Sequence, residues 1–130
     1  MTTAQDVLAT NQAFYQAFER LDIDALSLVW SKAPKVTCIH PGRSALRGWE
    51  QIRFSWDQIF RNTKQLEVAA DVIATEVIGN VAYVVLVENL VQVVPERRME
   101  VQTMVTNIFE YEDGNWFLVH RHTSPMMQAA

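Results

Sequence analysis

Residues 66–94 have the sequence LEVAADVIATEVIGNVAYVVLVENLVQVV, in which two runs rich in β-branched residues are joined by Gly79-Asn80. A two-residue Gly-Asn link between such runs indicates a tight hairpin. A similar composition continues in a run from Arg98 to Glu112 and in a last run from Asn115 to Ser124, which are joined by Asp113-Gly114. The links and runs together predict an antiparallel meander of four long strands, with residues 95–97 turning the chain between the second and the third.

Helical spacing dominates the first half of the chain. A helix is predicted after Thr2 or Thr3, either of which can cap it, because apolar residues recur near the helical period at Val7, Phe14, Phe18 and Leu21. Asp22 can cap a second, short helix that stops before Pro34.

A strand over residues 35–40 and a loop over 41–48 come next, and the apolar spacing from Trp49 predicts a third helix that ends near Asn62. Helices followed by a meander are typical of an α+β domain, with three N-terminal helices packed on one face of a curved antiparallel sheet.

Length and charge restrict the class of protein. With 130 residues the chain matches one domain, residues 1–130. Its net charge of −4 and the lack of a Lys/Arg cluster argue against nucleic-acid binding. No apolar run approaches the roughly 20 residues of a membrane span, and the first residues lack a basic signal start, so we expect a soluble cytoplasmic protein.

The single cysteine, Cys38, has no partner for an internal disulfide. It lies within an apolar segment, where cysteine usually behaves as a small buried hydrophobe, and a reactive thiol is the less favoured alternative.

The strands are apolar on both faces. Residues 81–87 are continuously apolar. Residues 116–119 are also all apolar, so apolar side chains point to both faces of the sheet there. Both faces therefore need cover, and the helices of so short a chain can cover only one. A homodimer through the sheet face is predicted, and a sheet that curls around its own interior is the alternative.

Several stretches resemble the nuclear-transport-factor-2-like superfamily, specifically its SnoaL-like group, which includes ketosteroid isomerase relatives. They are Phe14-Tyr15-Gln16-Ala17-Phe18, Ile39-His40-Pro41-Gly42, Asp113-Gly114-Asn115-Trp116 and the segment from Val119 to Ser124. The resemblance implies a cone-shaped, cystatin-like α+β barrel around an apolar cavity, commonly in dimeric proteins. Because this scaffold carries many functions, activity must be argued from the cavity.

His40 is the first candidate for catalysis. An imidazole near its ordinary pKa of about 6.5 can act as a base or acid at neutral pH. In the ketosteroid isomerase relatives this strand ends in a catalytic Asp-Pro, and the matching pair here is His40-Pro41. The alternative is a histidine that only satisfies backbone groups at the strand end. Whether the bond before Pro41 is cis stays open.

Strand alternation places His120 and His122 on the same face as Trp116 and Leu118, and Arg121 on the other. If that shared face is concave, the two histidines line the cavity near His40. Three histidines can hold zinc, but no further ligand spacing accompanies them, so neither a metal nor a cofactor is predicted.

The remaining candidates are ligand-binding groups. Asn107 is a neutral hydrogen-bond donor, and Glu88 is either buried with a partner or exposed at a strand end. Arg43 and Arg47 could recognise an anion, although a solvated loop charge is more common. Aromatic residues are expected in the core, with edges that form the cavity wall: Tyr15, Trp30, Trp56, Phe60 and Tyr83.

Two departures from the isomerase pattern matter. Phe14 stands where those relatives have a hydrogen-bonding tyrosine, with Tyr15 pointing about 100° away along the helix. Met104 or Val105 stands where they have a protonated aspartate. Unless Asn107 or His122 supplies a donor, no oxyanion hole is evident.

Two functions follow from these patterns. The first is a ligand-binding or accessory domain for an apolar small molecule. The second is an isomerase, lyase or cyclase with His40 as general base.

Overall fold

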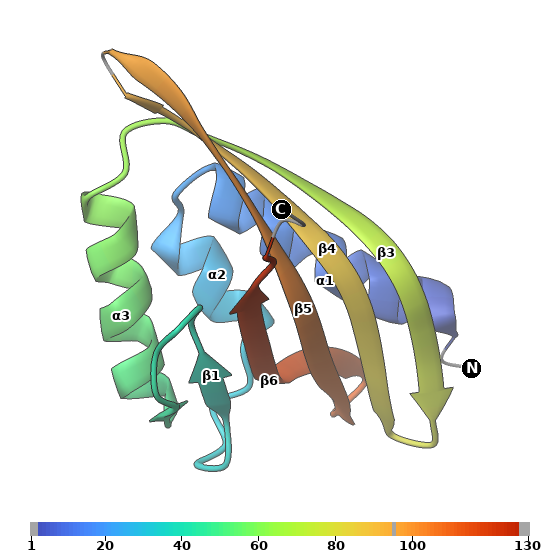
Figure 1. Ribbon diagram of the computed structural model, residues 1–130. Coiled ribbons are helices and arrows are strands. Elements are labelled where there is room, and N and C mark those ends of the chain that lie inside the picture. Colours follow the sequence, from blue (N-terminus) through green and yellow to red (C-terminus); the bar gives the residue numbers. More distant parts are fainter. Residues whose placement is uncertain (1–2, 95, 128–130) are drawn as a thin grey trace.

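The computed structural model describes residues 3–94 and 96–127 (Figure 1). Its elements in chain order are α1 (Ala4–Glu19), α2 (Ile23–Val29), β1 (Thr37–Ile39), β2 (Leu46–Arg47), α3 (Trp49–Arg61), β3 (Leu66–Ile78), β4 (Val81–Val94), β5 (Arg97–Glu112) and β6 (Asn115–Pro125). The three predicted helices and the four-stranded meander are confirmed. The two-residue strand β2 lies in the segment expected to be a loop.

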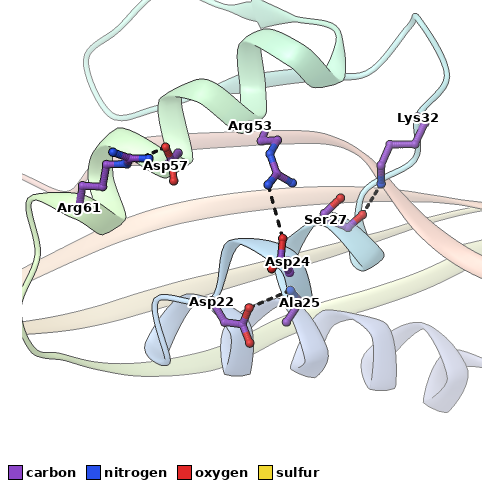
Figure 2. Close-up of polar contacts among 8 residues, drawn as sticks. All are labelled: Asp22, Asp24, Ala25, Ser27, Lys32, Arg53, Asp57 and Arg61. Carbon is purple, nitrogen blue, oxygen red and sulfur yellow. Dashed lines mark hydrogen bonds and ion pairs between the residues drawn. The ribbon is translucent and has the colours of Figure 1, made fainter.

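The predicted N-caps explain where α1 and α2 begin. The Thr3 hydroxyl accepts a hydrogen bond from the Asp6 backbone N–H at 3.4 Å, and the Asp6 carboxylate accepts one from the Thr3 N–H at 2.9 Å. Thr2, the other cap candidate, lies outside the described residues. The Asp22 carboxylate accepts from the Ala25 N–H at 3.0 Å, as Figure 2 shows.

One ion pair links α3 to α2. Figure 2 shows Arg53 of α3 reaching Asp24 of α2, with a distance of 3.4 Å between Nη2 and Oδ1. Both side chains are exposed, so this ion pair adds little stability. The position of α3 depends mainly on its buried face, which consists of Ile52, Trp56 and Phe60.

The hairpin links have the backbone conformations that their residues favour. Gly79 has φ +63°, and Asp113 and Gly114 have φ 49° and +89°. Glycine adopts this left-handed region without steric cost, and aspartate tolerates it better than most residues. The predicted Gly-Asn and Asp-Gly hairpins are therefore confirmed. Pro95, in the remaining link, lies outside the described residues.

The six strands form one curved sheet in the order β2-β1-β6-β5-β4-β3. Figure 1 shows the three helices together on one side of it. The sheet does not close on itself, because β2 and β3 remain at its two edges. All neighbouring strands are antiparallel except β1 and β6, which run parallel. The fold therefore agrees with the expected α+β class, and the cone is open rather than a closed barrel.

A bulge in β6 reverses the expected facing of its side chains. Ile108 of β5 pairs with His120, but the next residue, Phe109, pairs with Leu118, which leaves Val119 unpaired. An extra residue in one strand shifts every later side chain to the opposite face. Leu118 is buried before the bulge, whereas Arg121 and Thr123 are buried after it. The predicted inward facing of His120 and His122 is wrong, and Arg121 faces the helices instead.

Within residues 3–94 and 96–127, no helix combines the length and the apolar character needed to cross a membrane.

Candidate functional site

A cavity of about 260 Å³ lies between α3 and the concave face of the sheet. Its apolar walls come mainly from Phe18, Trp56, Ile59, Leu66 and Leu90. Its ionisable residues are His40, Arg43, Glu88 and Arg121. Ligand pockets commonly measure roughly 300–1,000 Å³, so this one suits a molecule smaller than most drugs.

His40 follows the end of β1 and is only 6% exposed. Its Nε2 lies 2.9 Å from the Ser55 hydroxyl oxygen, and that hydroxyl donates to the Ile52 carbonyl oxygen at 2.8 Å. Because the only hydroxyl proton of Ser55 is used in that bond, Nε2–H of His40 is the donor to Ser55. The proton-accepting lone pair of His40 is therefore on Nδ1. The bond between His40 and Pro41 is trans.

Burial keeps His40 neutral at pH 7. The pKa of His40 is lowered to about 4, mainly by desolvation and also by the nearby Arg121 and Arg43 cations, against an opposing effect of Glu88. The expectation of an ordinary imidazole pKa is therefore wrong. In the unliganded cavity His40 is an uncharged and comparatively weak base.

Glu88 and Arg121 form a buried ion pair, with 2.8 Å between Oε2 and Nη2 and exposures of 1% and 2%. The other carboxylate oxygen of Glu88 accepts a hydrogen bond from the Thr103 hydroxyl at 3.3 Å. Nη1 of Arg121 donates to the Tyr15 hydroxyl at 3.1 Å, and its Nε has no partner among the described residues. Of the two alternatives for Glu88, the buried and paired one is confirmed.

Aromatic rings surround the Arg121 guanidinium. Its carbon lies 4.9 Å from the ring centroid of Phe14 and 5.6 Å from that of Trp56. These cation–π contacts lower the cost of burying the charge. Strand alternation pointed Arg121 away from the core, so sequence reasoning missed it. The available signal was that a carboxylate buried in an apolar strand needs a partner, and a cation is one of the possible partners.

Tyr15 lies beside this ion pair but outside the cavity. It is buried, and burial raises the pKa of its hydroxyl above the ordinary value. It lines a separate groove between α1 and β3. Although Phe14 cannot donate a hydrogen bond, the neighbouring Tyr15 brings a hydroxyl into the core.

The other predicted ligand-binding residues are spread over the molecule. Asn107 is fully buried and donates to the Asn11 side chain at 3.0 Å. Phe60 packs on Trp56, and Trp30 packs on Trp49, with ring centroids 5.7 Å and 6.1 Å apart. None of Asn107, Phe60 and Trp30 lines the cavity. Tyr83 is half-buried, in a strand whose neighbours Ala82 and Val84 face inward, so it lies on the outer face.

His120 and His122 lie on the outer face of the sheet, away from His40. His120 Nδ1 is 2.5 Å from the Thr37 hydroxyl oxygen, and His122 is exposed. The three histidines therefore do not converge. Among the described residues, no group of three or more His, Cys, Asp or Glu side chains is placed to hold a metal ion.

Cys38 is buried and does not line the cavity. Desolvation raises the pKa of its thiol to about 11, although Arg121 and Trp56 act in the opposite direction. At neutral pH almost none of it is thiolate, which is the reactive form. The prediction of a buried cysteine is confirmed.

Comparison with known proteins identifies relatives over nearly the whole chain. F-box protein SKIP8 of Arabidopsis thaliana is 24% identical over 126 residues, which are 96% of this chain, and the chain spans about half (52%) of that protein. A proposed dehydratase of the NTF2-like family from Streptomyces avermitilis is similar in structure, with a TM-score of 0.88, 29% identity and coverage of 95% of this chain and 97% of the other.

A proposed calcium/calmodulin-dependent protein kinase type II association domain from Thiobacillus denitrificans is also similar, with a TM-score of 0.84, 25% identity and coverage of 92% and 94%. The sequence profile of the SnoaL-like domain matches residues 7–128. This match covers the whole sheet, α2, α3 and most of α1, so the chain belongs to the SnoaL-like domain family, within the NTF2-like fold.

Proposed function

We propose that this chain binds a small, largely apolar molecule in the His40 cavity. The observation that carries the proposal is the combination of apolar walls, including Trp56 and Ile59, with the polar groups of His40, Glu88 and Arg121. Ligand sites are typically apolar pockets with a few placed polar groups.

Ligand-observed NMR with a library of small fragments tests this proposal. We expect a subset of uncharged aromatic fragments to bind the wild type, and we expect Ile59→Trp to weaken these hits at least about tenfold because the larger side chain fills the cavity. Ile78→Trp is the matched control, since Ile78 is 68% exposed and does not line the cavity. A library without hits, or hits that Ile59→Trp leaves unchanged, would contradict cavity binding.

A second candidate function is proton transfer by His40. The hydrogen bond to Ser55 holds the neutral ring with its proton-accepting lone pair on Nδ1, and the ring lines the cavity where a substrate would bind. The 29% identity to a proposed dehydratase supports an isomerase, lyase or cyclase activity of this kind.

For any substrate that the wild type converts, His40→Gln should lower kcat at least about 100-fold because it removes the base, while the amide can still donate to Ser55. Steady-state kinetics measures this effect, and substrate affinity should change little. His122→Gln is the control, since that side chain is exposed on the outer face. Wild-type turnover in His40→Gln would exclude this base.

We also propose a homodimer through the outer face of the sheet. Half-buried apolar side chains gather there on three neighbouring strands, including Val85, Ile108 and Phe117. The structural relative described as an association domain supports self-association. The cytoplasmic location stays a prediction from the sequence.

A further inference from the structure

We propose that Glu88 sets the charge class of the ligand: by neutralising Arg121 in the cavity wall, it selects uncharged molecules and excludes small anions. This inference rests on the proposed binding function and adds a specificity-determining residue to it. The pair belongs to the same wall as His40 and Trp56, so a ligand in the cavity meets both charges together.

Without Glu88 the cavity would attract anions. Its other charged wall residues are Arg121 and Arg43, both cationic, and His40 is neutral at pH 7. The Glu88 carboxylate lies 2.8 Å from Arg121 Nη2, and both side chains are almost fully removed from water. The pair therefore has no net charge, and its two charges largely offset each other for a ligand group that lies about equally far from both.

Binding of a carboxylate in this cavity is electrostatically unfavourable. It brings a third charge into a site where one cation is already paired, so one negative charge stays uncompensated away from water. The ligand also approaches the Glu88 carboxylate, which already accepts a hydrogen bond from Arg121 Nη2. An amide or ketone adds no net charge and avoids this penalty.

Arg43 does not compensate the negative charge of a bound carboxylate. It lies on the loop after β1 and is exposed, so water and salt screen its charge. The charge class is therefore set by the buried pair, and within that pair Glu88 is the group that opposes anions.

Benzamide and benzoate test the inference, because they have nearly the same shape and differ in charge at pH 7.5. Calorimetric or NMR titration of the wild type should show benzamide binding at least about tenfold more tightly than benzoate. In Glu88→Gln, which leaves Arg121 unpaired, benzoate affinity should rise at least about tenfold and the preference should reverse. Glu67→Gln, at an exposed ion pair with Arg98, is the matched control and should keep the wild-type ratio.

Each outcome has a distinct meaning. Equal or tighter binding of benzoate by the wild type overturns the role of Glu88 but leaves cavity binding intact, whereas binding of neither probe overturns both. Arg43→Gln, a loop variant expected to fold, should keep the ratio within about threefold. A tenfold change there would assign the charge selectivity to the loop cation instead. If Glu88→Gln does not fold, the wild-type ratio and Arg43→Gln still test the inference.

Discussion

Arg121→Met should lower the free energy of unfolding by about 3–5 kcal/mol, because it leaves the Glu88 carboxylate buried without its cation. The methionine fills much of the same space among Phe14 and Trp56 but offers no charge and no donor to Glu88 or Tyr15. Urea unfolding at pH 7.5, followed by circular dichroism, measures the loss.

Two further variants separate the charge from the packing. The double variant Glu88→Leu/Arg121→Met removes both charges, and we expect it to recover more than half of the loss, since apolar replacements of buried pairs are often neutral. Arg98→Met makes the same substitution at the exposed pair with Glu67 and should cost less than about 1 kcal/mol. A loss in Arg121→Met no larger than in Arg98→Met would show that the buried pair does not stabilise the fold.

Acidification should destabilise the protein through His40 by roughly 2–3 kcal/mol between pH 6.5 and pH 4. In the folded chain desolvation lowers the pKa of His40 to about 4, whereas an unfolded histidine has a pKa of about 6.5. Over that interval the unfolded chain binds a proton that the folded chain does not. The stabilisation from a neutral His40 is complete above pH 6.5 and is lost as the pH falls.

Comparison of variants isolates this contribution from those of the acidic residues. In urea titrations at several pH values, His40→Gln should lose that part of the pH dependence, because glutamine keeps a donor for Ser55 and does not titrate in this range. His122→Gln, at an exposed position on the outer face, should retain the wild-type dependence. Parallel stability curves for the wild type and His40→Gln would rule out a lowered pKa for His40.

The candidate site differs from the sequence-based prediction mainly in the residues that the second half of the chain contributes. His40, Glu88 and Trp56 were predicted and do line the cavity. The predicted partners of His40, which were His122 and Asn107, lie elsewhere, and Arg121 takes the place facing the helices. Two adjacent apolar residues, Leu118 and Val119, are both buried at the bulge. The sequence does show apolar residues on both faces of this strand segment. We interpreted them as evidence that a second subunit covers the sheet.

Local sequence was sufficient for the elements and for the hairpins. Caps such as Thr3 and Asp22, and glycines such as Gly79, act on residues within four positions, so their effects can be recognised without knowing the rest of the chain. The resemblance to the SnoaL-like group also depends on short motifs, and it led to the correct fold.

Only the tertiary structure determined which side chains share the cavity. The facing of β6 depends on its register with β5, because the bulge at Val119 exists only relative to the paired strand. Likewise, Glu88 and Arg121 are 33 positions apart and meet through the pairing of three strands. Burial then gives the site its chemistry, since removal from water is what binds this ion pair tightly and keeps His40 uncharged.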